Sequence, residues 1–256
     1  MNLKGDGTNT CSINNISMIL FNHLTLIMKA IILAAGLGKR LGKITKEIPK
    51  PLLPIKGIPI IELIIRKIKN AGIKNIGVNT FYKADMVEEY LKKFKGLKIV
   101  REEYLSGTGG ALLNFKDFVS EDFLIHNCDI LSDIDLKRVI SVHKRIKPLA
   151  TIVLVDNYKT NRVRISKNYA VKFYKKRTEG CYTYTGIAVL SKRIFKYFPE
   201  NKKVFSLTEV YNMAIKKGEL IYCLLVRNIW YDIGTYKVYN LLQHNSLETL
   251  LTEFII

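Results

Sequence analysis

The sequence predicts an α/β fold with a mixed, mainly parallel sheet flanked by helices. From residue 29 to about residue 149, short apolar runs alternate with segments whose apolar residues recur at helical spacing. Such alternation is typical of right-handed βαβ units. The first run, KAIIL at residues 29–33, is almost wholly apolar and is followed by Ala-Ala-Gly. This pattern favours a strand that is buried on both faces of a sheet.

The first half of the chain supplies the alternating elements. The helix expected at 59–71 has Pro59 near its first turn and Gly72 as its stop signal. The expected strands are 29–33, 75–80, 97–100 and 123–126, and the expected helices are 59–71, 84–94, 108–118 and 134–146. Ligands of such sheets bind at the carboxyl ends of the strands.

The pattern changes after Leu149, where strands follow one another in quick succession. The expected elements are strands at 150–155, 162–166, 170–174 and 182–190, helices at 191–198 and 207–217, a strand at 220–227 and a helix from about residue 237. Residues 1–27 differ in composition, and we expect a poorly ordered N-terminal extension or a misassigned start codon there. We therefore expect residues 28–256 to form a single domain.

Composition excludes several classes of protein. The 256 residues are 48% hydrophobic and 25% charged, the balance of an ordinary globular chain. No apolar run reaches the roughly 18–20 residues that a membrane-spanning helix needs. The four cysteines are far apart, without a C-x-x-C pair, which argues against a disulfide scaffold or a zinc site. A reducing cytoplasm is the simplest compartment.

The chain is strongly basic, with 41 Lys and Arg against 22 Asp and Glu and a formal net charge of +19. No block of five or six like charges marks a basic tail, and no aromatic residues interleave with a basic strand or helix. The charge therefore favours a solvated surface that attracts anionic small molecules such as nucleotides and sugar phosphates. We expect neither a nucleic acid nor a membrane as partner.

A glycine turn directly after the first strand is the most informative local motif. It contains Ala35, Gly36 and Gly38, and glycines let backbone N–H groups approach phosphate oxygens. The segment is neither a dinucleotide fingerprint, whose third glycine would fall at Leu41, nor a Walker A loop. A bare glycine turn is more often structural than functional. Arg40 and the proline-flanked Lys50 add two cations, which suit a triphosphate with a pyrophosphate leaving group.

Two aspartates stand where a metal site could form. Asp129 follows a predicted buried strand, and Asp232 precedes a glycine turn. Either one alone is more often a helix cap or a turn residue. As a pair they offer hard oxygen ligands of the kind that Mg²⁺ takes together with phosphate oxygens.

Five segments, in order along the chain, resemble the motifs of the sugar-1-phosphate nucleotidyltransferases. They are LAAGLGKRLGKITKEIPKPLLPI at 33–55, EEYLSGTGGA at 102–111, NCD at 127–129, YTGI at 184–187 and WYDIGT at 230–235. The resemblance spans about residues 29–239. The most similar groups are mannose-1-phosphate and heptose-1-phosphate guanylyltransferases and N-acetylmuramate-1-phosphate uridylyltransferases.

The resemblance implies a Rossmann-like fold with a small sugar-binding lobe and a Mg²⁺-dependent reaction. An NTP and a sugar 1-phosphate would give an NDP-sugar and pyrophosphate. Arg40, Lys50 and Asp129 would be catalytic, and Asp129 and Asp232 would hold the metal. The nucleotide would be bound by Ala35, Gly36, Gly38, Arg40, Lys50, Glu102, Gly107 and Asp129.

Glu102 occupies the base-reading position of the family, five residues before Gly107. A carboxylate accepts hydrogen bonds from adjacent N–H donors, of which guanine offers two and uracil one. GTP is therefore favoured, followed by UTP. The other interpretation of Glu102 is a solvated acid at a strand end.

On the sugar side, the resemblance implies that Lys176, Thr185, Gly186 and Glu209 bind the sugar phosphate. Glu209 could instead cap its helix. Lys176 matches the lysine of the family's F-x-E-K-P motif, in which Lys175 here replaces the glutamate and Arg177 the proline. Further departures are Asn161-Arg162-Val163 for Tyr-Gly-Val, Cys128 for the glycine of N-G-D, and Lys39 for Thr or Ser.

Three alternatives and one undetermined property remain at this point. A cytidylyltransferase for a polyol or choline phosphate shares the opening motif, although the GTGGA and WYDIGT segments argue against it. A catalytically inactive regulatory homologue would keep the fold with an altered sugar site, and a nucleic-acid-binding module is the third alternative. The sequence leaves the oligomeric state open, with a homodimer as one option.

Overall fold

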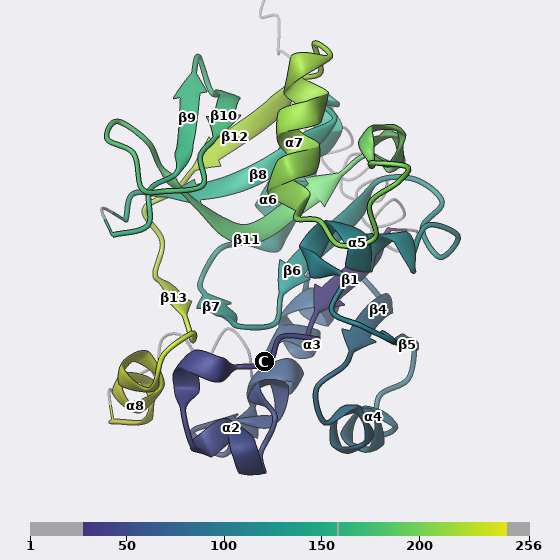
Figure 1. The fold of residues 1–256 in the computed structure, drawn as a ribbon, viewed down its shortest axis with the longest axis vertical. Helices are drawn as coiled ribbons and strands as arrows, with labels where there is room; N and C mark the ends of the chain where they lie inside the picture. Colours follow the sequence, from purple (N-terminus) through teal and green to yellow (C-terminus); the bar gives the residue numbers. More distant parts are fainter. Residues whose placement is uncertain (1–27, 158, 245–256) are drawn as a thin grey trace, which may run out of the picture.

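A nine-stranded mixed sheet forms the centre of the molecule in the computed structural model, which describes residues 28–157 and 159–244 (Figure 1). Its spatial order is β5-β4-β1-β6-β11-β8-β12-β10-β9. The strands are β1 (Lys29–Leu33), β4 (Asn75–Thr80), β5 (Leu97–Arg101), β6 (Phe123–Asn127), β8 (Ala150–Val155), β9 (Val163–Ser166), β10 (Tyr169–Phe173), β11 (Thr183–Leu190) and β12 (Ile221–Leu225).

The alternating first half of the chain builds the parallel end of this sheet. Strand β1 pairs in parallel with β4 and β6, and β4 pairs in parallel with β5. Strand β11 runs antiparallel to β6 and β8, whereas β12 is parallel to β8. The hairpin β9–β10 then extends the sheet antiparallel to β12. The predicted α/β class with a mixed sheet is confirmed.

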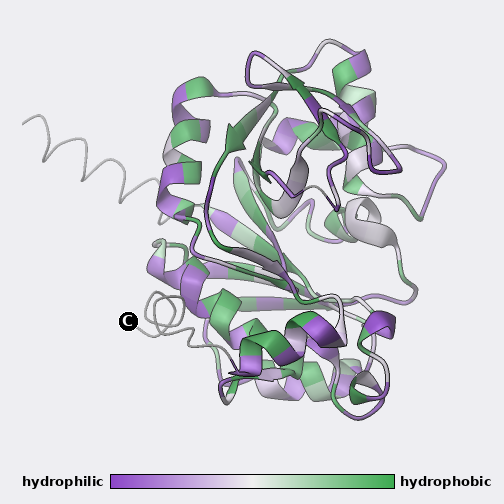
Figure 2. Ribbon diagram, turned by 90° about the vertical axis from the view of Figure 1, so that its left-hand side faces the viewer, coloured by the Kyte–Doolittle hydropathy of each residue, from purple (hydrophilic) through white to green (hydrophobic). Residues whose placement is uncertain are grey.

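Helices cover both faces of the sheet, and the side chains of β1 alternate between them. Ile32 packs in one core cluster with α3 (Ile60–Asn70), α4 (Ala84–Leu91), α6 (Leu136–Ile146) and α8 (Tyr236–His244). Ile31 packs in the other with α5 (Gly107–Leu113), the 3-10 helix η3 (Lys192–Tyr197) and α7 (Leu207–Lys216). Hydrophobic residues dominate the central strands (Figure 2). The buried apolar run at residues 29–33 is thus a strand between two helical layers.

Several short elements give no periodic signal in the sequence. They are η1 (Lys39–Leu41), α2 (Ile44–Glu47), η2 (Lys50–Leu52), the two-residue strands β2 (Pro54–Ile55) and β3 (Ile58–Pro59), and the strand pair β7 (Ile130–Ser132) and β13 (Trp230–Asp232). Conversely, the helix expected at 108–118 ends at Leu113. Phe115 and Val119 are buried in the core, but they lie in the turns that follow the helix. The segment 191–198 is 3-10 rather than α-helical.

The part of the chain expected to form a small lobe is continuous with the main sheet. Strands β10 and β9 are the last two strands at one end of the nine-stranded sheet, and α7 packs against β10 (Figure 1). Asn212 of α7 fixes this contact, since its side chain both accepts from the backbone N–H of Phe173 and donates to its carbonyl, each at 2.9 Å. The segment expected to form the lobe therefore extends the nine-stranded sheet.

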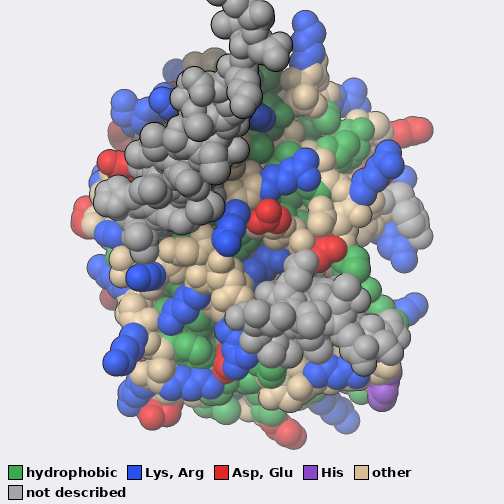
Figure 3. Space-filling view, turned by 180° about the vertical axis from the view of Figure 1, so that it is seen from behind, with side chains coloured by type: hydrophobic (Ala, Val, Ile, Leu, Met, Phe, Trp, Pro, Cys, Tyr) green, Lys and Arg blue, Asp and Glu red, His purple; other side chains and the backbone are tan. Residues whose placement is uncertain are grey.

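The expectation for residues 1–27 lies outside the described residues. Within residues 28–157 and 159–244, no helix has the length and apolar character to cross a bilayer. Cys128, Cys181 and Cys223 are buried free thiols. On the face seen in Figure 3, Lys and Arg side chains are spread among acidic and apolar ones.

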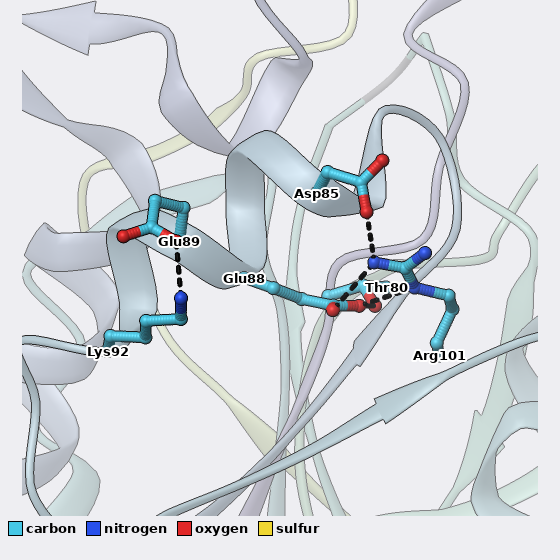
Figure 4. A network of polar contacts seen from close by, with 6 residues as sticks. All are labelled: Thr80, Asp85, Glu88, Glu89, Lys92 and Arg101. Carbon is cyan, nitrogen blue, oxygen red and sulfur yellow. Dashed lines mark hydrogen bonds and ion pairs between the residues drawn. The ribbon is translucent and has the colours of Figure 1, made fainter.

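A polar network braces the carboxyl ends of β4 and β5 against α4 (Figure 4). The Arg101 guanidinium donates to Asp85 at 2.6 Å and to both carboxylate oxygens of Glu88 at 2.9 and 2.7 Å. Glu88 also accepts from the Thr80 hydroxyl at 2.7 Å. These contacts fix Thr80 at the end of β4, next to Asn79, and Arg101 at the end of β5, next to Glu102.

A second acid, Glu62 of α3, is buried where α3 meets the end of α4. It accepts hydrogen bonds from Arg66, from Tyr90 and, at 2.7 Å, from Lys93. Burial raises the pKa of Glu62, but the hydrogen bonds of Lys93, Tyr90 and Arg66 outweigh it and lower the pKa from 4.5 to about 2. The folded state therefore favours the ionised carboxylate.

We predict that Glu62→Gln lowers the free energy of unfolding at pH 7 by about 1–3 kcal/mol, a range reduced for the exposure of Arg66 and Lys93. Because the folded pKa lies below the unfolded one, this stabilisation is present above about pH 4.5 and is lost as pH falls towards 2. Denaturant unfolding of both proteins at several pH values measures the difference. Glu89→Gln, which breaks only an exposed pair with Lys92, is the control. A wild-type advantage that does not shrink on acidification would contradict this origin.

Candidate active site

Three adjoining clefts lie at the carboxyl ends of β1, β4 and β6, and Asp129 lines all three. The glycine-turn cleft, about 330 Å³, is lined by Gly36, Gly38, Arg40 and Lys50 among others. The Glu102 cleft, about 200 Å³, is lined by Ala35, Asn79, Glu102 and Gly107. The lobe cleft, about 670 Å³, is lined by residues of β9, β10, β11 and α7 among others. Its volume is that of a typical small-molecule site.

The glycine turn leaves open space for a ligand. A Cβ atom added at Gly36 would meet nothing within 4 Å. Gly38 has φ +64°, and a Cβ there would lie 2.8 Å from the Thr45 methyl group. The turn thus needs glycine at position 38 for both its backbone conformation and its packing.

Two ion pairs connect the predicted cations and carboxylates. Lys50 Nζ lies 2.6 Å from Asp129 Oδ2, and the Lys50 side chain is only 11% exposed. Arg40 Nη2 lies 3.9 Å from Asp232 Oδ2 and is 67% exposed. Lys50 is therefore a fixed charge, whereas Arg40 is free to turn towards a ligand.

The strand pair β7–β13 brings the two aspartates together. It runs antiparallel and places Asp232 opposite Ile130, the residue after Asp129. The Ile233 N–H also donates to the Asp129 carbonyl at 2.8 Å. Carboxylates 103 positions apart, from 129 to 232, thereby share one site.

These carboxylates fit a divalent cation. The pKa of Asp232 is raised above its usual value, mainly by burial and then by the negative charge of Asp129. The positive charges of Lys50 and Arg40 oppose this shift only in part. Asp232 Oδ1 is buried without a hydrogen-bond partner. In the part of the chain that the structure describes, no group of three or more His, Cys, Asp or Glu gathers as a metal centre. Two carboxylates with phosphate oxygens completing the shell suit Mg²⁺.

Glu102 is buried and already bonded on both carboxylate oxygens. Oε1 accepts from Asn79, whose own Oδ1 accepts from the Ala34 N–H at 2.7 Å. Oε2 accepts from the Ser106 N–H at 3.0 Å and from its hydroxyl at 2.7 Å. Glu102 thus connects the glycine turn to residues 106–110, and the interpretation as a solvated strand-end acid does not hold, since only 6% of Glu102 is exposed.

The start of α5 is held against the start of α7 through Phe205. The Phe205 carbonyl accepts from Gly109 at 3.0 Å, and the Phe205 N–H donates to Ser106 at 3.0 Å. Gly107 has φ +75°, and a Cβ there would lie 2.6 Å from the Phe205 carbonyl oxygen. Only glycine therefore allows this close approach.

The lobe cleft contains most of the residues expected on the sugar side. Thr185, Gly186 and Glu209 line it, together with Asp129, Asp232 and Arg40. Glu209 forms a capping box with Ser206 and an ion pair with Lys202, so it caps α7 while facing the cleft. Lys176 is not among the lining residues, whereas its neighbour Lys175 is.

Sequence reasoning did not assign a role to two residues of the lobe cleft, Arg162 and Lys175. Both residues depart from the family motifs that the sequence resembles. The signal that could have found them is their shared change towards positive charge on the sugar side.

The fold and the site together define an α/β protein with an open glycine turn, two adjacent cations and a carboxylate pair. The chain belongs to the nucleotidyl transferase family, whose model matches residues 29–248. It is 35% identical over 214 residues to a D-glycero-alpha-D-manno-heptose 1-phosphate guanylyltransferase of Campylobacter jejuni, covering 81% of this chain and 95% of the relative. It is 32% identical over 227 residues to the bifunctional protein GlmU of Methanococcus aeolicus, covering 86% of this chain and 54% of the relative. The chain thus spans about half the length of the GlmU relatives.

Solved structures show the same fold. A UDP-glucose pyrophosphorylase from Acinetobacter baumannii superposes with a TM-score of 0.75 at 21% identity, covering 89% of this chain and 97% of that one. HddC from Yersinia pseudotuberculosis, complexed with GMP-PN, gives a TM-score of 0.71 at 24% identity, covering 84% and 98%.

Proposed function

We propose that the protein transfers a nucleotidyl group from an NTP to a sugar 1-phosphate, releasing pyrophosphate. The observation that carries the proposal is the gathering of Arg40, Lys50, Asp129 and Asp232 around the open glycine turn. Family membership and the guanylyltransferase relatives support the same reaction. The free thiols of the described cysteines support a reducing cytoplasm as its location.

The residues of the site would act by positioning and charge. Backbone N–H groups at Gly36 and Gly38 would hold phosphate oxygens, and Arg40 and Lys50 would balance the charge of the departing pyrophosphate. An oxygen of the sugar phosphate would attack the α-phosphorus, so that one P–O bond forms as the bond to the β-phosphate breaks. Mg²⁺, held by Asp129 and Asp232, would supply neutralisation of the phosphate charge. The site then needs no side-chain nucleophile.

We propose GTP as the preferred donor, then UTP. Glu102 lines the same cleft as Gly107. Two relatives are named heptose-1-phosphate and mannose-1-phosphate guanylyltransferase, and these names specify transfer of a guanylyl group. Because Asn79 and Ser106 already donate to Glu102, a base would have to share its remaining lone pairs.

A pyrophosphate-release screen of four NTPs against a panel of sugar 1-phosphates tests the proposal. We expect turnover with GTP and a sugar 1-phosphate in the presence of Mg²⁺. Turnover only with CTP and a polyol or choline phosphate would identify a cytidylyltransferase. Nucleotide binding without any turnover would identify an inactive regulatory homologue.

The aspartate pair gives the first prediction for this site. Asp129→Asn and Asp232→Asn should each lower kcat by at least about 100-fold, on the order of 2.7 kcal/mol of transition-state stabilisation, because each removes a charged metal ligand. Steady-state kinetics over a Mg²⁺ titration measure the loss, with circular dichroism to confirm the fold. Asp135→Asn, which alters the cap of α6 away from the clefts, is the matched control. Near-normal, EDTA-resistant turnover of both variants would remove the metal assignment.

Glu102 gives the second prediction. Glu102→Ala should lower kcat/KM for GTP by about 30- to 150-fold, because a bidentate charge-assisted contact contributes roughly 2–3 kcal/mol. The loss for UTP should be smaller, since uracil offers one donor. Ser106→Ala removes one internal partner of Glu102 but no base contact, and it should affect both nucleotides alike. A Glu102→Ala enzyme with the wild-type ratio of GTP to UTP activity would show that the base is read elsewhere.

A further inference from the structure

Asn79, the second-last residue of β4, connects the glycine-turn cleft with the Glu102 cleft. Its side chain is hydrogen-bonded to Ala34, which lines the glycine-turn cleft. It is also hydrogen-bonded to Glu102, and both residues line the Glu102 cleft. Only 2% of Asn79 is exposed. One buried side chain therefore contacts a residue of each cleft.

The strand register explains the contact with the glycine turn. Strands β1 and β4 pair in parallel, with Leu33 opposite Asn79. Ala34 is the first residue after β1, where the paired register ends, and its N–H donates to Asn79 Oδ1 at 2.7 Å. The start of the glycine turn is thereby fixed to the end of β4.

The same amide group holds the carboxylate of Glu102. Asn79 Nδ2 donates to Glu102 Oε1, and among residues 28–157 and 159–244 it is the only donor to that oxygen. Glu102 Oε2 has two donors, the Ser106 N–H at 3.0 Å and the Ser106 hydroxyl at 2.7 Å. Oε2 would keep a backbone donor if the hydroxyl were removed. Oε1, in contrast, depends on Asn79 alone.

These two contacts require the chemistry of an amide at position 79. An amide has an acceptor and a donor on one planar group, whereas a carboxylate has acceptors only. The backbone N–H of Ala34 and the carboxylate of Glu102 thus determine which way the Asn79 amide is turned. A buried carboxylate oxygen without a donor is costly. Asn79 therefore determines the direction in which Oε1 of Glu102 is held.

We propose that Asn79 is a positioning residue of the nucleotide site, which orients Glu102 towards the base and sets its distance from the glycine turn. This inference rests on the proposed nucleotidyl transfer and on the assignment of Glu102 to the base. The base and the triphosphate of a nucleotide are joined by a single ribose, so a site that binds both needs a fixed spacing between its two clefts. A buried hydrogen-bonded support provides such preorganisation.

Two variants of Asn79 separate its two contacts. Asn79→Ala removes both, whereas the nearly isosteric Asn79→Asp keeps an acceptor for the Ala34 N–H and replaces the donor by an oxygen that repels Glu102. Steady-state kinetics of the full chain with GTP or UTP, Mg²⁺ and the sugar 1-phosphate found in the screen measure the effect. Both variants should lower kcat/KM for GTP by about 10-fold or more, mainly through KM, because a hydrogen bond to a charged group is lost. The ratio of kcat/KM for GTP to that for UTP should fall by at least about 3-fold.

Matched controls separate this role from a merely structural one. Ser106→Ala removes a hydrogen bond to the other oxygen of Glu102. Thr80→Val removes the hydrogen bond of the adjacent β4 residue to Glu88 (Figure 4), and Thr80 lines none of the three clefts. Both controls should keep the GTP to UTP ratio within about 2-fold of wild type. Circular dichroism confirms that each variant is folded.

A double variant shows whether Asn79 acts through Glu102. In a Glu102→Ala background, Asn79→Ala should lower the GTP to UTP ratio no further, because residues that act through one contact are not additive. A further fall of the ratio would show that Asn79 reads the base independently and would overturn the positioning role.

The other contrary results overturn different statements. A wild-type ratio in Asn79→Asp would restrict Asn79 to holding the glycine turn and would overturn the inference alone. A ratio that Glu102→Ala leaves unchanged, or a lack of turnover with GTP, would overturn the inference together with the base assignment. Failure of every NTP with every sugar 1-phosphate would overturn the proposed function itself.

Discussion

The antiparallel pairing of β7 with β13 is the interaction on which the candidate site depends. Without it, Asp129 would stand at the end of β6 with only Lys50 as its partner, and Asp232 would lie on a distant segment. The pairing also holds Gly234 against Arg40, where an added Cβ would come within 2.5 Å of the guanidinium. Two three-residue strands with no periodic signal of their own thus bring the carboxylates to the cations and the glycine turn.

The sequence predicted the elements that are buried on both faces and missed those that depend on distant partners. The bounds of β1, β4 and β8 agree with the expected ranges. In β1 and β8, nearly continuous apolar runs mark strands that lie between two helical layers. The strands β7 and β13 have three residues each, and each pairs with a partner about a hundred residues away in the sequence. Local periodicity contains no information about such pairs.

The sequence predicted which residues belong to the candidate site, but not how all of them are bonded within it. The order of the motifs that resemble the nucleotidyltransferases was enough to expect Arg40, Lys50, Asp129 and Asp232 in one site. It could not show that Glu102 is bonded internally, since Asn79 and Ser106 reach it only through the fold. Nor could spacing decide between Lys175 and Lys176, because the residue that faces the cleft is set by the turn after β10.

The separation of the two aspartates also has a consequence for how the molecule folds. Closing a loop of about a hundred residues costs conformational entropy, and the contacts that repay this cost form after local ones. The glycine turn follows directly on β1, whereas the carboxylate pair exists only once β13 has joined β7. Catalytic competence is therefore a property of the completed domain, and during refolding the return of activity should follow, never precede, the return of the far-ultraviolet circular dichroism of the sheet.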